Sequence, residues 1–171
     1  MESTNVSNVL QQLLSAGTGP VPVAAQNDFH DLARQAAPDD LSQGLAAAFN
    51  SSQTPAFGEM VAHMFDQANA GQKAGIVNKL LSGLGPAAMT ILSQLGLSAA
   101  IRPEAGAVHN MSTDQATQLS LSQVQQIANQ AQSANPGIVE SMSNFYAQHP
   151  VLVKSLGAAA LAIILGKIRN R

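Results

Sequence analysis

Three side chains that can bind a metal ion or transfer a proton lie close together in the sequence: Glu59, His63 and Asp66. They stand at positions i, i+4 and i+7, so a helix would place them on one face. The spacing differs from the two-histidine arrangement of zincins, and no second histidine or cysteine cluster accompanies it. The exposed polar face of an ordinary helix has the same pattern. We therefore predict a solvated helix face here rather than a metal site.

A second set of titratable residues, Asp28, His30 and Asp31, lies at an expected helix start. Capping and the helix dipole explain carboxylates at such a position, and His30 then needs no further role. His109 and His149 each stand alone, which is typical of a surface or packed imidazole rather than a general base. The sequence therefore predicts no catalytic, cofactor-binding or metal-binding residues, and we expect a protein that is not an enzyme.

The composition argues against several classes of chemistry. The 171 residues include no cysteine, which excludes disulfides, thiolate zinc sites and cysteine nucleophiles. Eight Lys and Arg residues in all, with a single Tyr for stacking, argue against nucleic-acid binding. Residues 81–86 are rich in glycine but lack the lysine and the preceding strand of a phosphate-binding loop.

Charged residues are sparse and unevenly placed. They make up 11% of the chain, against ~25% in ordinary domains, so solubility depends on Gln, Asn and Ser. Residues 1–72 carry a net charge of -6 and residues 73–171 a net charge of +4. The two halves either attract each other within the fold or attract other molecules. Because residues 1–14 lack the basic leader of a secretory signal, we expect a cytoplasmic location, with a peripheral membrane location as the alternative.

The most apolar stretch is residues 151–168, which carry no charge between Ser155 and Gly166. A helix that is apolar on all sides must be surrounded by other helices or by lipid. From Ser155 to Gly166 such a helix spans ~18 Å, which is short of the ~30 Å hydrocarbon layer of a membrane. We predict a buried core helix, and a membrane-facing segment stays open as the alternative. Three bases follow the apolar run: Lys167, Arg169 and Arg171.

Residues 1–26 are expected to form a separate part of the chain. Apolar residues recur at helical spacing in residues 3–16, whereas the Gly/Pro-rich residues 17–26 have no period, as in a mobile linker. The expected helix either docks on its own bundle or enters a groove on a partner. Its apolar face consists of Val6, Val9, Leu10, Leu13 and Leu14.

Residues 27–171 are expected to form one helical domain. Helix starts are predicted at Asn27 or Asp28, Thr54–Pro55, Asn69 with Gln72, Ser112 with Thr113, Ser120 with Gln123, and Asn135–Pro136. Helix ends are predicted at Gly83 and Gly96, followed by an irregular joint over residues 97–109. Nothing alternates with a period of two, so no strand is predicted. The predicted fold is an all-α, single-domain bundle of seven to nine helices around the C-terminal helix.

Three long stretches of the chain resemble a group of small, uncharacterised, all-helical proteobacterial proteins. These stretches are DLARQAAPDDLSQGLAAAF, TPAFGEMVAHMFDQANAGQKAGIVNKLL and SMSNFYAQHPVLVKSLGAAALAIILGKI. The likeness covers most of the chain from Asp28 on. It implies a bacterial, helical protein and transfers no catalytic residues. The Gln/Leu-rich segment near Leu121 also resembles the YidB-like proteins in composition.

The expected function is that of a non-catalytic interaction or assembly module. A polar surface with few charges loses little hydration free energy on association, and the uneven charge favours head-to-tail pairing with a protein partner or a second copy. The alternative is a membrane-surface accessory protein that uses the C-terminal apolar helix and the bases behind it. An enzyme with an unrecognised site is the third interpretation.

Overall fold

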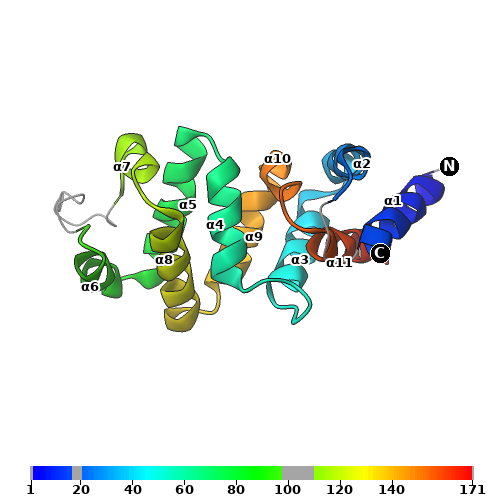
Figure 1. The fold of residues 1–171 in the computed structure, drawn as a ribbon. Coiled ribbons are helices and arrows are strands. Elements are labelled where there is room, and N and C mark those ends of the chain that lie inside the picture. Colours follow the sequence, from blue (N-terminus) through cyan, green and yellow to red (C-terminus); the bar gives the residue numbers. More distant parts are fainter. Residues whose placement is uncertain (1, 17–20, 98–109, 171) are drawn as a thin grey trace. The chain divides into compact units, whose positions relative to one another are not determined.

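The described part of the chain is entirely helical. The computed structural model describes residues 2–16, 21–97 and 110–170, with side chains from residue 7 on. These residues form eleven helices and no strand, which confirms the all-α prediction (Figure 1). The helix count exceeds the predicted seven to nine. Very short helices contribute to the excess, namely α7 (Thr113–Thr117) and α10 (Pro150–Val153).

The helices group into two compact units. Unit 1 combines the two ends of the chain, Met1–Ala56 and Ser143–Arg171, and unit 2 is the segment between them, Phe57–Met142. The division falls inside α9 (Ile138–Ala147). Unit 2 is therefore an insertion in unit 1. The separate part expected over residues 1–26 stays a prediction, but the linker predicted over residues 17–26 is wrong for residues 23–26, because they form the first turn of α2.

Unit 1 is built around α11 (Ala158–Arg169), which packs between α3 (Pro38–Phe49) and α1 (Glu2–Ala16) (Figure 1). A further helix, α2 (Val23–Gln35), contacts α1 and α10. Leu161, Ile164 and Leu165 of α11 are fully buried, so the prediction of a buried core helix is confirmed.

The single helix predicted over residues 151–168 is wrong, because the chain breaks between α10 and α11. The Ser155 hydroxyl donates to the Leu152 carbonyl oxygen over 2.6 Å, which occupies an acceptor that a continuing helix would use. Gly157 then forms the N-cap of α11 with an extended backbone, φ -66° and ψ 165°. Leaving a helix costs Ser and Gly less free energy than it costs the surrounding Ala and Leu residues.

Gly44 allows α3 and α11 to approach each other closely. A Cβ at this position would lie 3.0 Å from the Ile164 Cα and 3.2 Å from the Ile164 carbonyl oxygen. Only a residue without a side chain leaves room for the backbone of the neighbouring helix there. Gly166 on α11 has no such neighbour, since a Cβ there would meet nothing within 4 Å.

Unit 2 is organised by α4 (Phe57–Gln67) and α5 (Ala70–Leu84), which both pack on α8 (Leu121–Ala134). A Cβ at Gly58 would lie 2.7 Å from the Gln125 carbonyl oxygen, so a glycine is required where α4 meets α8. The large buried side chains of the three helices are Phe57, Met60, Val61, Met64, Phe65, Ile76, Val77, Leu80, Leu81, Leu84, Val124 and Ile127.

The Asn78 side chain on α5 holds the backbone of Met111. Its Nδ2 donates to the Met111 carbonyl oxygen over 3.1 Å, and its Oδ1 accepts from the Met111 N–H over 2.7 Å. This pair of hydrogen bonds fixes the chain just before α7. The joint predicted over residues 97–109 lies, apart from residue 97, outside the described residues.

The predicted capping boxes are confirmed. The Asn69 Oδ1 accepts from the Gln72 N–H over 2.9 Å, and the Gln72 side chain accepts from the Asn69 N–H over 3.0 Å. Ser120 and Gln123 form the same reciprocal pair at the start of α8. Ser112 caps α7 in this way as well. Local sequence therefore determined these three helix starts.

Three other helix starts were predicted wrongly. The α2 helix begins at Val23 behind Pro22, so the cap at Asn27 or Asp28 does not exist. The α4 helix begins at Phe57 rather than Pro55, because the Thr54 hydroxyl donates to the carbonyl oxygens of Ala48 in α3 and of Ser51 in the loop after it. The α9 helix begins at Ile138, two residues after Pro136.

Two predicted helix ends have different outcomes. The α5 helix continues through Gly83 to Leu84, and Gly85 with φ 54° is its C-cap. The α6 helix (Ala87–Gln94) is followed by Leu95 and then by Gly96 with φ 74°, as predicted. A positive φ explains why glycine stands at each of these two ends.

Candidate functional site

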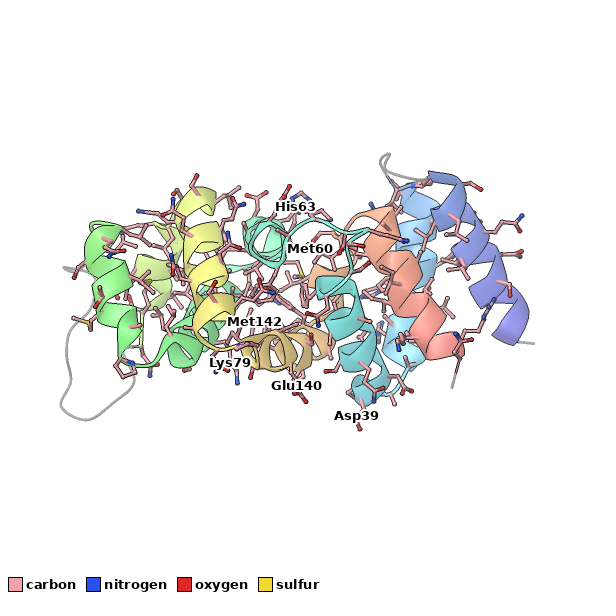
Figure 2. All side chains as sticks on the ribbon, turned by 90° about the horizontal axis from the view of Figure 1, so that it is seen from below. Asp39, Met60, His63, Lys79, Glu140 and Met142 are labelled. Atoms are coloured by element: carbon pink, nitrogen blue, oxygen red, sulfur yellow. The ribbon has the colours of Figure 1, made fainter. Side chains whose placement is uncertain are left out.

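The structure places Glu59, His63 and Asp66 on the exposed face of α4. Figure 2 shows His63 on the outer side of this helix and Met60 on its inner side, where Met60 is buried. Within the described residues, no group of three His, Asp or Glu side chains is arranged to hold a metal ion. The three side chains share a face of α4, but they do not point toward a common binding site.

Asp28, His30 and Asp31 lie in the middle of α2, because the helix begins at Val23. Capping therefore does not explain the two carboxylates. His30 Nδ1 lies 3.8 Å from Asp31 Oδ1, within range of an ion pair when the imidazole is protonated. Asp28 and Asp31 are one turn apart on the same face, and this face is turned toward α1.

A polar hollow of about 310 Å³ separates α1 from α2, and we call it the α1/α2 groove. Its described lining is Asn8, Val9, Gln12, Asp28, Asp31, Leu32 and Gln35. A second hollow of about 590 Å³ shares Asn8 and Gln12 with it and extends along α1 to Ser15 and Pro22. Carboxylates and carboxamide oxygens of this kind accept hydrogen bonds from ammonium and guanidinium groups.

The α1/α2 groove exists because α1 docks on its own unit. Val9 and Leu13 are buried, with exposed fractions of 2% and 1%, and α1 contacts both α11 and α2. Leu14, on the same predicted apolar face, is 66% exposed. The Val6 side chain lies outside the described residues. Sequence reasoning missed the groove because helical spacing does not identify the helix against which a face packs.

His149 is a packed imidazole. Its Nδ1 lies 2.9 Å from the Phe145 carbonyl oxygen, one turn earlier, and its ring stacks on the Phe145 ring with centroids 4.6 Å apart. One ring nitrogen and one face of the imidazole are thus in contact with Phe145 of α9. His109, the other isolated histidine, lies outside the described residues.

Tyr146 is the most unusual polar group of unit 1. Its side chain is fully buried, and its hydroxyl finds no hydrogen-bond partner in the described part of the chain. Burial raises the pKa of this phenol well above its ordinary value, since an ionised oxygen would be desolvated. The ring packs against Phe145 and Phe49, with centroids 5.5 Å and 6.1 Å away. A phenol in this environment stays neutral and serves packing rather than proton transfer.

None of the described helices combines the length and the apolar character needed to cross a membrane. The chain was also compared with protein-family models, with curated proteins and with solved structures. The likeness to small proteobacterial helical proteins and to YidB-like proteins stays a prediction, since none of these comparisons found a match.

Proposed function

We propose that this chain is a non-catalytic assembly module of a bacterial cytoplasm, in which the α1/α2 groove of one copy receives the basic end of α11 of another. The observation that carries the proposal is the pair of carboxylates, Asp28 and Asp31, which face α1 across the groove. No base is present among the described residues that line it. Lys167 and Arg169 are exposed at the end of α11 and have the opposite charge.

The distribution of charge in unit 1 supports this pairing. Residues 1–56 have a net charge of -4 and residues 143–171 a net charge of +4, so the unit is neutral overall but carries opposite charges on different helices. The contacts of α2 with α10 and of α3 with α11 let the two segments attract each other within one fold. The exposed Lys167 and Arg169 are placed to attract a second copy as well.

The expected association is weak and sensitive to salt. An ion pair between exposed side chains contributes about 0–1 kcal/mol, and the Debye length falls from ~30 Å at 0.01 M salt to ~8 Å at 0.15 M salt. Two carboxylates and two bases in one contact are therefore expected to give a reversible pair at low ionic strength rather than a permanent dimer.

Sedimentation velocity over a range of protein and salt concentrations tests the proposal. The chain is expected to self-associate at low salt, and Asp28→Asn with Asp31→Asn is expected to abolish this. The matched control is Glu59→Gln with Asp66→Asn, which removes the same charge from exposed positions in unit 2. A chain that is monomeric at every concentration and at both salt extremes would refute the proposal.

A charge exchange tests the pairing directly. Asp28→Lys with Asp31→Lys is expected not to self-associate, and Lys167→Glu with Arg169→Glu is expected to behave in the same way. A mixture of the two variants has two attractive contacts, because the acidic groove of the second variant faces the basic end of the first and the basic groove of the first faces the acidic end of the second. Complexes that contain both variants are therefore expected to form. If the mixture stays monomeric while the original chain associates, the contact lies elsewhere.

A membrane-surface accessory role is the second candidate, and the exposed bases Lys167 and Arg169 favour it. Most apolar residues of α11 are buried, and the helix contacts α3 and α1, so the basic end is its most exposed part. Co-sedimentation with vesicles rich in anionic lipid, lost on Lys167→Ala with Arg169→Ala, would place this role ahead of assembly. Vesicles of neutral lipid serve as the control.

A further inference from the structure

The α1 helix is held in unit 1 by a narrow apolar stripe. Val9 and Leu13, one turn apart, are buried, whereas Leu14 on the same helix is largely exposed. Within the described residues, no hydrogen bond or ion pair joins a side chain of α1 to another helix. The Ser15 hydroxyl donates to the Gln11 carbonyl oxygen of the same helix over 2.8 Å. Apolar contacts therefore hold α1 in place.

The packing beside α1 is incomplete. Two hollows of about 590 Å³ and 310 Å³ lie along this helix, and both are lined by Asn8 and Gln12. The larger hollow also extends to Pro22, at the start of α2. The close-packed interior of a protein contains few voids larger than a water molecule. The α2 helix therefore covers α1 only in part.

The contacts of α3 are tighter than those of α1. Gly44 of α3 lies against the backbone of Ile164 in α11, where a Cβ would come within 3.0 Å of the Ile164 Cα. The Ser42 hydroxyl of α3 donates to Asn144 Oδ1 of α9 over 2.5 Å, so a polar bond adds to the apolar contacts. Neither contact involves α1. Because elements with few buried contacts open at a lower free energy than the core, α1 is the part of this group expected to open first.

The connection between α1 and α2 is long enough for α1 to move by itself. Six residues, 17–22, connect the two helices, and six residues reach ~20–22 Å when they are extended. When α1 leaves its place, the side of α11 that it covers becomes accessible. Every copy of the chain contains the same helix, so the α1 of a second copy fits this side of α11 as well.

We propose that α1 is an exchangeable arm, which leaves α11 while the rest of unit 1 stays folded and docks on α11 of a second copy. Each copy then gives its α1 and receives the other, which forms a closed pair with two-fold symmetry. In such a pair the α1/α2 groove contains Asn8 and Gln12 of one copy and Asp28 and Asp31 of the other.

The concentration at which such pairs form follows from the length of the connection. The contacts in the pair are those of the single chain, so the connection within one copy is what favours docking on the same copy. A short flexible connection corresponds to an effective concentration on the order of 1 mM. Pairs are therefore expected as the protein concentration approaches this value.

Hydrogen exchange of the full chain, at a dilution where copies do not pair, tests the release of α1. Backbone amides of residues 9–13 are expected to exchange at least ~100-fold faster than the amides of α3 and α11, because α1 opens without the rest of unit 1. If the amides of α1 and α11 exchanged equally slowly, α1 would leave only when the whole unit unfolds, and the proposal would be wrong.

Paramagnetic relaxation in mixed copies tests docking on a second copy. The chain has no cysteine, so Gln11→Cys gives a single attachment site for a spin label on an exposed position of α1. Spin-labelled copies are mixed with isotope-labelled original copies at ~1 mM protein and in ~1 M salt, where the Debye length is ~3 Å. Amide signals of α11 in the isotope-labelled copies are expected to broaden.

The pattern of broadening distinguishes an exchanged arm from other kinds of association. The arm makes the same contact in both cases, so the amides that broaden between copies are expected to match those that broaden within one copy carrying both labels at high dilution. Absence of broadening in α11, or a different set of broadened amides, would overturn the proposal.

A pair of variants in the spin-labelled copies identifies the contact. Val9→Ser with Leu13→Ser removes the apolar stripe and is expected to abolish the broadening between copies. Leu14→Ser with Val23→Ser removes apolar side chains that are 66% and 71% exposed and is expected to leave the broadening unchanged. Equal broadening by the two variants would contradict docking through the stripe.

The exchange of α1 does not rest on the attraction between the groove and the basic end of α11. Asp28→Asn with Asp31→Asn is expected to abolish the association at low salt and to leave the broadening in ~1 M salt unchanged. The two proposals therefore fail separately.

Discussion

Gly44 of α3 lies directly against the backbone of Ile164 in α11, so close that a Cβ would come within 3.0 Å of the Ile164 Cα. Backbone atoms of a packed helix cannot rotate away as a side chain can. Gly44→Ala is therefore expected to lower the free energy of unfolding by about 1–3 kcal/mol through overpacking. Urea denaturation followed by circular dichroism measures the change.

Gly166→Ala is the matched control in the same helix pair. A Cβ there meets nothing within 4 Å, and Ala favours the helix over Gly by about 0.5–1 kcal/mol. This variant is expected to be slightly more stable than the original chain. If both variants lost stability equally, close approach at Gly44 would not be the cause.

Tyr146→Phe is expected to leave the free energy of unfolding unchanged or to raise it. The hydroxyl is buried without a partner in the described part of the chain, and an unpaired buried polar group costs about 1–3 kcal/mol. Phe keeps the ring contacts with Phe145 and Phe49. Tyr146→Ala, which removes the ring as well, is expected to cost about 3–5 kcal/mol. A loss of more than 1 kcal/mol in the Phe variant would show that the hydroxyl is satisfied.

Alkaline pH is expected to destabilise the fold through the same residue. Burial raises the pKa of Tyr146 in the folded state, so above pH ~10 the unfolded chain releases a proton that the folded chain keeps. This difference favours unfolding by about 1.4 kcal/mol per pH unit above pH ~10 and has no effect below it.

Because Tyr146 is the single tyrosine and the chain has no tryptophan, ultraviolet absorbance of the tyrosinate reports this group alone. Ionisation is expected to coincide with unfolding, and the additional alkaline slope is expected to be absent from Tyr146→Phe. Titration at pH ~10 in a chain that is still folded would contradict the burial.

Asn78→Ala is expected to lower the free energy of unfolding by about 1–3 kcal/mol, because it leaves both polar backbone atoms of a buried residue, Met111, without their partner. Hydrogen exchange at the Met111 amide is expected to accelerate. Asn50→Ala serves as the control, since Asn50 is exposed and its side chain donates only to the Ala46 carbonyl of its own helix. The control is expected to change stability by less than ~0.5 kcal/mol.

A chain that ends after Gln148 lacks α10 and α11 and is expected to aggregate or to lose its cooperative thermal transition. Leu161, Ile164 and Leu165 are buried, and each such side chain contributes about 1.5–3 kcal/mol. The contribution of three such side chains is close to the whole free energy of unfolding of a typical domain, about 5–15 kcal/mol. A chain that ends after Ile168 lacks the exposed Arg169 and Asn170, together with Arg171, and is expected to stay folded. If the chain that ends after Gln148 were soluble and folded, α11 would not be part of the core.

The sequence predicted the fold class and the features that depend on a few neighbouring residues. Asn69 with Gln72 and Ser120 with Gln123 each contain a complete set of donors and acceptors within three residues, so their helix starts could be predicted. The burial of Leu161, Ile164 and Leu165 followed from the apolar character of residues 151–168. Their break at Gly157 did not, because a run of apolar residues gives no period from which an interruption could be seen.

The candidate sites could not be predicted for a different reason. Asp28 and Gln12 line the same groove between α1 and α2 only because Val9 and Leu13 dock α1 on its own unit. Likewise, Gln94 and Gln126 line a polar hollow of unit 2 from helices that are far apart in the sequence. Spacing identifies the apolar face of a helix, but tertiary packing decides which other helix lies against that face. The cluster found from helical spacing, Glu59 with His63 and Asp66, is a row of exposed side chains.

The insertion of unit 2 between the two segments of unit 1 imposes an order on folding during synthesis. Residues 57–142 leave the ribosome as one uninterrupted block, whereas α1 and α3 must wait for α11, and α2 must wait for α10. At ~5–20 residues per second, that wait lasts roughly 4–17 s for the inserted block alone. During this time the apolar surfaces of α1 and α3 that later cover α11 have no native partner. A chaperone that binds exposed apolar helices is therefore expected to engage the nascent chain on residues 1–56 and to be released when residues 158–169 emerge.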